Sequence, residues 1–164
     1  MMDEWVWILP VLFALHDLEE IATISWWSRR LDSDAFGKNE WIQDKVLRKL
    51  ARVEVGKFSL AVLEEMVILT LVCIISIMFS IYGLWWGLFL AYGLHLAVHF
   101  LQAVYLRGYI PGLVFVVIEL PVYFWMLQRL SPFFSLSQTL LWGFVGIVIM
   151  VLNLQVLHRW MRRE

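Results

Sequence analysis

The sequence has little cysteine and little charge. Cys73 is the single cysteine among 164 residues, which excludes an intrachain disulfide and a zinc-finger framework. It lies in an apolar run, so we expect a buried, inert thiol. Only 16% of the residues are charged, and the formal net charge of −1 shows no basic excess that would suggest nucleic acid. The chain contains no internal repeat or low-complexity tract, and its length predicts a single domain over residues 1–164.

Hydrophobic residues dominate what is present. They make up 62% of the chain, whereas soluble domains are about half apolar. A spanning helix needs about 20 mostly apolar residues, and we find such runs at residues 5–25, 58–81, 85–106, 110–127 and 136–157. The first run lacks the basic start and small-residue cleavage site of a signal peptide. The sequence therefore predicts an all-α polytopic membrane protein, a five-helix transmembrane bundle.

The connections between the runs are short, with one exception. Short connections predict antiparallel neighbours in a compact bundle. The long connection, residues 26–57, is polar at first and then shows an apolar stripe flanked by basic residues from about Glu40. This pattern predicts an amphipathic helix on the cytoplasmic membrane surface.

The positive charges predict an orientation. With the N-terminus outside and the C-terminus cytoplasmic, 12 of the 13 Lys and Arg residues lie on the cytoplasmic side, and only Arg129 lies outside. Cytoplasmic loops carry such an excess. We therefore expect an N-out, C-in protein of the plasma (inner) membrane.

The first apolar run contains an unusual polar segment, His16-Asp17-Leu18-Glu19-Glu20. Placing Asp at the centre of a membrane helix costs about 2.5–3.5 kcal/mol on insertion scales. Such residues face a partner, a metal or water, and they mark a functional site by default. Asp17 lies about 100° around the helix from His16, so we expect it at the edge of any cluster.

The other apolar runs carry further polar residues at similar depth. If the helices span as predicted, most of these residues lie about 8–16 Å from the cytoplasmic end. We expect Glu119 near a kink at Pro121 and close helix approach at Gly112 and Gly146. The polar residues that converge with the first run are Glu64, Glu65, His95, His99, Gln102, Glu119 and Asn153.

Imidazoles and carboxylates from facing helices are how helical bundles bind metal ions. We therefore predict a divalent metal site, either zinc or a di-iron or di-manganese pair. An unligated acid would serve as the catalytic acid or base, and Glu20, Glu64 and Glu65 are the candidates. Gln102 and Asn153 are expected to join helices rather than bind metal. The predicted ligands are His16, Glu19, Glu20, Glu65, His95, His99 and Glu119.

The motif His16-Asp17-Leu18-Glu19-Glu20 resembles that of the HXXEE-domain family of small integral membrane proteins. Three further segments look family-like, namely Glu64-Glu65, the segment from His95 to Gln102, and Tyr109-Ile110-Pro111-Gly112. The resemblance implies a multi-span membrane protein with a polar centre that could bind metal. It implies no particular reaction.

Three function classes follow. The leading hypothesis is a membrane-embedded metalloenzyme, a hydrolase or a di-iron-type oxidoreductase, that acts on a lipid or other apolar substrate at the inner leaflet. The second is a metal-independent lipid isomerase that moves protons with His and Glu alone. The third is a non-enzymatic proton-coupled transporter or small-ligand-binding membrane protein. The expected partners are a lipid or apolar small molecule and the membrane.

Overall fold

The structure, a computed structural model, describes residues 2–31 and 54–161. Most of the described residues are helical, as predicted, and the helices at residues 55–161 are joined by short turns. Most of the long connection, including its predicted amphipathic helix, lies outside the described residues. The helices are α1 (Asp3–Val6), α2 (Ile8–Leu31), α5 (Val55–Phe79), α6 (Gly83–Leu106), α7 (Leu113–Leu130), the 3₁₀ helix η2 (Ser131–Phe133) and α8 (Leu136–Met161).

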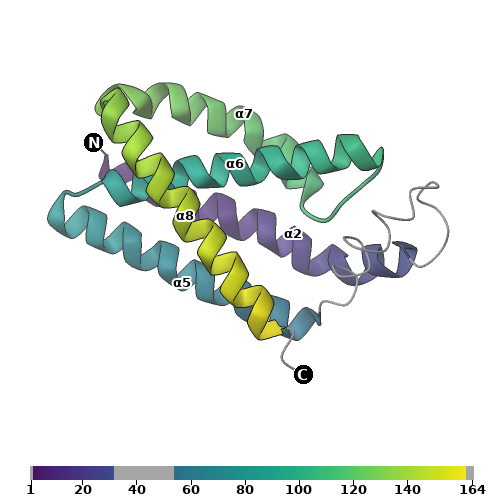
Figure 1. Cartoon of the computed structure of the whole chain (residues 1–164). Helices are drawn as coiled ribbons and strands as arrows, with labels where there is room; N and C mark the ends of the chain where they lie inside the picture. The colour runs from purple at the N-terminus through teal and green to yellow at the C-terminus, as the bar shows by residue number, and fades with distance from the viewer. Residues whose placement is uncertain (1, 32–53, 162–164) are drawn as a thin grey trace.

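The helices form a bundle in which α8 crosses the others obliquely (Figure 1). Helix α6 packs against α7, α5 and, most extensively, α8, while α2 packs against α5 and α7. The two chain termini lie at opposite ends of the bundle (Figure 1). The turn between α6 and α7 lies at the end of the bundle opposite the N-terminus (Figure 1).

Among residues 2–31 and 54–161, four helices, not the five predicted, are long and apolar enough to cross a membrane. They comprise α5, α6, α7 with η2, and α8. Helix α2 has 24 residues, as many as α6, but it carries three carboxylates, Asp17, Glu19 and Glu20, within one turn. Its composition, rather than its length, therefore separates it from the others.

Helix α7 begins three residues later than predicted, because the segment before it is a turn rather than a helix. Gly112 has a left-handed backbone, with φ of 83°, and precedes Leu113, the first residue of α7. Glycine adopts this conformation without steric cost. The turn directs α7 back along the bundle.

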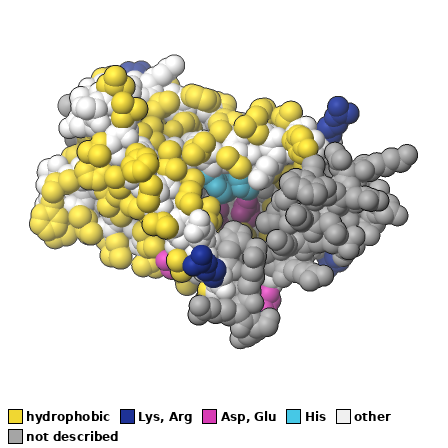
Figure 2. All heavy atoms as spheres, in the orientation of Figure 1, with side chains coloured by type: hydrophobic (Ala, Val, Ile, Leu, Met, Phe, Trp, Pro, Cys, Tyr) yellow, Lys and Arg dark blue, Asp and Glu magenta, His cyan; other side chains and the backbone are white. Residues whose placement is uncertain are grey.

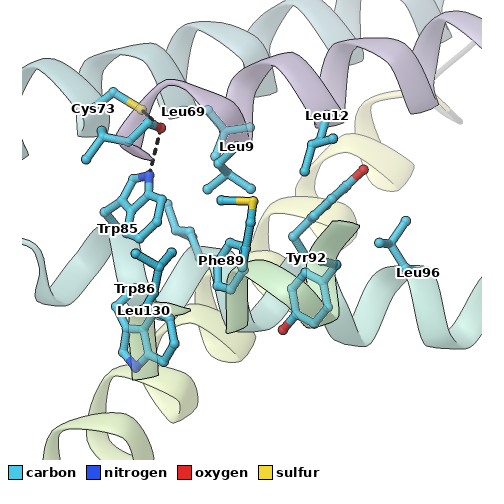
Figure 3. Packing of buried hydrophobic residues seen from close by; sticks show 14 of the residues in the cluster. Leu9, Leu12, Leu69, Cys73, Trp85, Trp86, Phe89, Tyr92, Leu96 and Leu130 are labelled. Carbon is cyan, nitrogen blue, oxygen red and sulfur yellow. Dashed lines mark hydrogen bonds between the residues drawn. The ribbon is translucent and has the colours of Figure 1, made fainter. Parts of the chain in front are cut away.

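Aromatic residues fill the end of the bundle nearest the N-terminus. Rings of Trp85, Phe89 and Trp86 stack with centroids 5.5 Å apart, and the indole of Trp85 donates a hydrogen bond to the carbonyl of Val6. Figure 3 shows these side chains pointing inward among leucines of α2. Cys73 is fully buried there, as predicted. This close packing occupies one end of the bundle and leaves the other end for polar residues.

Helices α6 and α8 approach through glycine. A Cβ atom added to Gly146 would lie 2.0 Å from the carbonyl oxygen of Gly87, so no side chain fits there. The close approach predicted at Gly146 is confirmed.

The outer surface of the bundle is apolar. Leucine, valine, isoleucine and phenylalanine side chains on α5, α7 and α8 are exposed, and hydrophobic side chains cover much of the described surface in Figure 2. Soluble monomers rarely expose contiguous apolar patches of this extent. The surface is compatible with an integral membrane protein.

Candidate functional site

Three histidines and one glutamate meet between α2 and α6. One donor atom from each of His16, Glu20, His95 and His99 lies within 4.8 Å of the donor atom of every other. The Nε2 atoms of His16 and His95 are 3.1 Å apart, and Glu20 Oε1 is 3.3 Å from His99 Nε2 and 3.6 Å from His16 Nε2. We call these four residues the four-donor cluster.

Helical spacing explains why the cluster forms. His16 and Glu20 are four residues apart on α2, and His95 and His99 are four residues apart on α6. Residues at this spacing lie one above the other on the same helix face. The two faces point toward each other, and the four side chains reach across the space between the helices. The side chain of His16 is completely buried, whereas those of Glu20 and His99 are 13% and 15% exposed.

The tautomer of His99 follows from its neighbours. Its Nδ1 atom is 3.3 Å from the backbone carbonyl oxygen of Pro111, which can only accept a hydrogen bond, so Nδ1 carries the proton. In the neutral ring, Nε2 is then an acceptor that faces the Glu20 carboxylate, which is also an acceptor. Two acceptors 3.3 Å apart need a proton between them, on the ring or on the carboxyl group, or a metal ion.

Glycine is required beside the cluster. A Cβ atom at Gly112 would lie 2.6 Å from Cε1 of His16 and 3.2 Å from Cγ of Glu20. The turn before α7 therefore packs directly onto the α2 half of the cluster, and its left-handed backbone allows this contact.

Glu19 has a different role from its neighbour Glu20. Its carboxylate accepts hydrogen bonds from the backbone N–H groups of Val114 (3.1 Å) and Phe115 (2.8 Å), and from the hydroxyl of Tyr109 (2.6 Å). The first N–H groups of a helix have no partner within it, and a negative charge is favourable at this end. Glu19 therefore caps α7 from another helix and lies outside the four-donor cluster.

Tyr109 connects this cap to the end of α2. Its backbone carbonyl accepts a hydrogen bond from the indole of Trp27 at 2.9 Å. Burial, together with the hydrogen bond to Glu19, raises the pKa of the Tyr109 hydroxyl to about 12. The neutral phenol is thus the form that this turn requires.

Glu119 is also predicted as a ligand, and the structure places it beside the cluster rather than in it. Its side chain is 1% exposed, and one of its carboxylate oxygens accepts a hydrogen bond from the hydroxyl of Tyr92. The Tyr92 ring packs edge-on against His16, with centroids 6.4 Å apart. The other oxygen of Glu119 and Nδ1 of His16 are both buried without a hydrogen-bond partner among the described residues.

Glu64 and Glu65 meet a residue of α8. The side-chain amide of Asn153 donates to Glu65 at 3.0 Å and to Glu64 at 3.4 Å. Of the two acids, Glu65 lines the cavity described next and Glu64 does not. Neither belongs to the four-donor cluster.

A cavity of about 970 Å³ lies between α2, α5, α6 and α8. Its walls are mainly apolar and include Phe13, Trp27 and Tyr92. Glu20, His95 and His99 of the cluster line it, as do Asp17, Glu65, Gln102 and Asn153. Figure 2 shows histidine and acidic side chains in an opening among hydrophobic ones. The cluster is therefore reached through an apolar cavity.

Sequence reasoning did not predict the roles of two tyrosines, and it placed one aspartate at the edge of the site rather than in the cavity wall. Tyr92 and Tyr109 hold predicted site carboxylates, and Asp17, expected at the edge, is 4% exposed and lines the cavity. The spacing offered a signal for Tyr92, which lies three residues before His95 on the same face of α6. Tyr109 stands in the family-like segment Tyr109–Gly112, but spacing does not predict its bond to Glu19, because that bond depends on how the turn folds.

Comparison with known proteins gives one match. A family model described as "Protein of unknown function with HXXEE motif" matches residues 7–126. The matched range contains the four-donor cluster, the Glu19 cap and the Tyr92–Glu119 pair, but it ends before Asn153. No curated protein and no solved structure matches the chain.

Proposed function

We propose that this chain, which belongs to the family of proteins with an HXXEE motif, is an integral membrane metalloenzyme acting on a lipid or other apolar substrate. One observation carries the proposal. His16, Glu20, His95 and His99 present donor atoms within 4.8 Å of one another at the wall of a largely apolar cavity. Concave apolar sites with a few convergent polar groups are typical of small-molecule binding.

The donor set suits zinc. Imidazole nitrogens and carboxylate oxygens are ordinary Zn²⁺ ligands, usually four in a tetrahedral arrangement, with one position left to water or substrate in catalytic sites. Metal-binding histidines usually donate their second N–H to a carbonyl or carboxylate, as His99 does to Pro111. A cation between Glu20 and His99 would also satisfy the two facing acceptors.

The contacts of the other acids favour a single ion over a di-iron or di-manganese pair. Carboxylate-bridged pairs in helical bundles use four glutamates and two histidines. Here Glu19 caps α7, Glu119 accepts from Tyr92, and Glu65 accepts from Asn153. Only Glu20 contributes a carboxylate to the four-donor cluster.

Each group has a role in the proposed hydrolysis. A zinc ion bound there would supply Lewis-acid chemistry. Zinc held by His16, His95 and His99 alone would leave its fourth position to water. Glu20, partly open to the cavity, is then placed to accept or return a proton. The cavity walls would hold the apolar part of the substrate and exclude water, and Gly112 and Pro111 would fix the orientation of His16 and His99.

The test is metal analysis of the purified full-length protein. We expect about one equivalent of a divalent metal per chain, with zinc affinity reduced at least about tenfold in His16→Ala and in His95→Ala. Glu64→Gln, a change outside both cluster and cavity, should leave zinc affinity unchanged. A wild-type protein that binds no metal after gentle purification and zinc titration would refute the proposal.

A second candidate, the metal-independent isomerase, has one observation in its favour. The hydrogen bond between His16 and His95 satisfies both Nε2 atoms without a metal. In that case, Glu20 and His99 would share a proton and pass it to the substrate. Catalytic turnover that survives strong chelation would favour the isomerase over the metalloenzyme.

We further propose that α2 crosses the membrane together with the four apolar helices, N-terminus outside, in the inner membrane. Its polar residues are covered by neighbouring helices, since His16 and Asp17 are buried. The opposite positions of the two termini (Figure 1) and the distribution of Lys and Arg both support this arrangement.

A further inference from the structure

Asp17 lies within the HXXEE motif but in neither the four-donor cluster nor the α7 cap. Its side chain is 4% exposed and lines the cavity. Among residues 2–31 and 54–161, none donates a hydrogen bond to its carboxylate or forms an ion pair with it. Buried polar groups in proteins are normally hydrogen-bonded, and buried charges are normally paired, so this carboxyl group lacks the partner that its burial requires.

The other acids that line the cavity already have partners. Glu20 faces His16 and His99, where the cation of the four-donor cluster would lie, and Glu65 accepts from Asn153. No Lys or Arg occurs among the described residues of the cavity lining. Asp17 is thus the carboxylate with free acceptor capacity, in a cavity that has an acidic and no basic lining. A cationic group on the ligand would give Asp17 the partner that it lacks.

The surroundings of Asp17 define the remainder of that ligand. Phe13 is four residues earlier on α2, on the same helix face, and its ring packs against Tyr92 with centroids 6.1 Å apart. Both rings line the cavity, and aromatic faces attract organic cations. The rest of the cavity wall consists mainly of aliphatic residues of α5, α6 and α8. At about 970 Å³, the cavity is large enough for a long hydrocarbon chain.

We propose that the cavity binds a long-chain amine, with its ammonium group on the Asp17 carboxylate and its hydrocarbon chain between α5, α6 and α8. This inference deepens the proposed function, because it names the substrate class of the same cavity. The ammonium–carboxylate contact itself does not require a metal. Neutral and anionic amphiphiles of the same length lack the group that Asp17 would pair with.

The test compares three probes of equal chain length, dodecylamine, dodecanol and dodecanoate, in competition binding to the full-length protein in neutral detergent at pH 7. We expect the amine to bind at least about tenfold more tightly than the alcohol, and dodecanoate to bind most weakly. Asp17→Asn keeps the side-chain shape and should bring amine and alcohol within about twofold. Asp3→Asn, the same change at an exposed position outside the cavity, should leave the preference unchanged.

Equal wild-type affinities for amine and alcohol would overturn the inference, even if Asp17→Asn failed to fold. An amine preference that persisted in a folded Asp17→Asn protein would also overturn it. Metal analysis separates this proposal from the previous one. An amine preference without bound metal would refute only the metalloenzyme, whereas bound metal without an amine preference would refute only this assignment.

Discussion

At the residue scale, the adjacent glutamates Glu19 and Glu20 have different roles. Glu20 faces the cavity and the histidines, whereas Glu19 caps α7 with hydrogen bonds to two backbone N–H groups and one tyrosine. Since α7 begins directly after the turn that packs on His16, the cap also holds the site together. The pair thus consists of Glu20, which faces the histidines, and Glu19, which fixes the helix that packs beside them.

Replacing Glu19 by alanine should destabilise the protein. It leaves the first N–H groups of α7 without their acceptor, and we expect the free energy of unfolding to fall by about 1–3 kcal/mol. Chemical denaturation in detergent micelles measures the change. Glu4→Ala, at an exposed position in α1, should stay within about 0.5 kcal/mol of wild type. Equal stability of the two variants would show that the cap contributes nothing.

The Glu19 cap should also give a pH dependence. An unfolded tyrosine loses its proton near pH 10, whereas burial and the Glu19 hydrogen bond raise the pKa of Tyr109 to about 12. Between these values the unfolded state releases its proton first, so the free energy of unfolding falls as pH rises from about 10 to about 12. Tyr109→Phe should remove this part of the fall, whereas Tyr105→Phe, at an exposed position, should not. Identical pH profiles for wild type and Tyr109→Phe would contradict the expectation.

Gly112→Ala should disturb the four-donor cluster without touching a donor. The new Cβ atom would lie 2.6 Å from His16 Cε1, at a backbone φ of 83° that alanine rarely adopts. We expect zinc affinity to fall by about 10–100-fold, as for residues that orient metal ligands. Gly56→Ala, where nothing lies within 4 Å of the new atom, is the control. Unchanged zinc affinity in Gly112→Ala would mean that His16 can move without loss.

At the element scale, the contact between α6 and α8 depends on glycine. Replacing Gly146 by leucine would force the helices apart, because even its Cβ atom would lie 2.0 Å from the Gly87 carbonyl oxygen. Overpacking of this kind typically costs about 1–3 kcal/mol, and thermal unfolding in detergent would detect it. Gly143→Ala, whose Cβ meets only the end of the Leu90 side chain at 3.2 Å, should cost much less.

Helical periodicity could predict much of this architecture. Hydrophobic length locates the ends of α5, α6 and α8 to within about four residues. The spacing of four places His16 and Glu20 on one face of their helix, and His95 and His99 on one face of theirs. Hydrophobic length could not predict the start of α7, because Ile110 is apolar and extends the hydrophobic run. The turn at Gly112 is what keeps Ile110 out of the helix. The partners of Glu19 depend on that turn, and the partner of Glu65 depends on the position of α8. No local pattern encodes either.

At the scale of the whole molecule, one end of the bundle is packed and the other is open. Aromatic rings of α6 and α7 fill the N-terminal end, and the cavity and the four-donor cluster occupy the opposite half of α2 and α6. Crossing of α8 permits both arrangements. It contacts α6 at Gly146 and then reaches α5 through Asn153, thereby forming a wall of the cavity.

Cysteine labelling can test whether α2 crosses the membrane. If all of the long helices cross, the start of α1 and the turn at η2 lie outside and the turn after α6 lies inside, because successive helices alternate in direction. A Cys73→Ala background removes the single native thiol. Single cysteines at the exposed positions Glu4, Ser131 and Arg107 then report the side on which each lies.

An impermeant maleimide should label Glu4→Cys and Ser131→Cys in intact cells, and Arg107→Cys only after permeabilisation. The Ser131 and Arg107 variants establish the orientation of the four apolar helices, so the Glu4 variant tests α2 alone. Labelling of Glu4→Cys only after permeabilisation, with Ser131→Cys still accessible, would place both ends of α2 on the cytoplasmic side. The α2 half of the four-donor cluster would then lie in a helix that enters the bundle without crossing the bilayer. The polar residues of α2 would in that case not have to be shielded from lipid along a full membrane span.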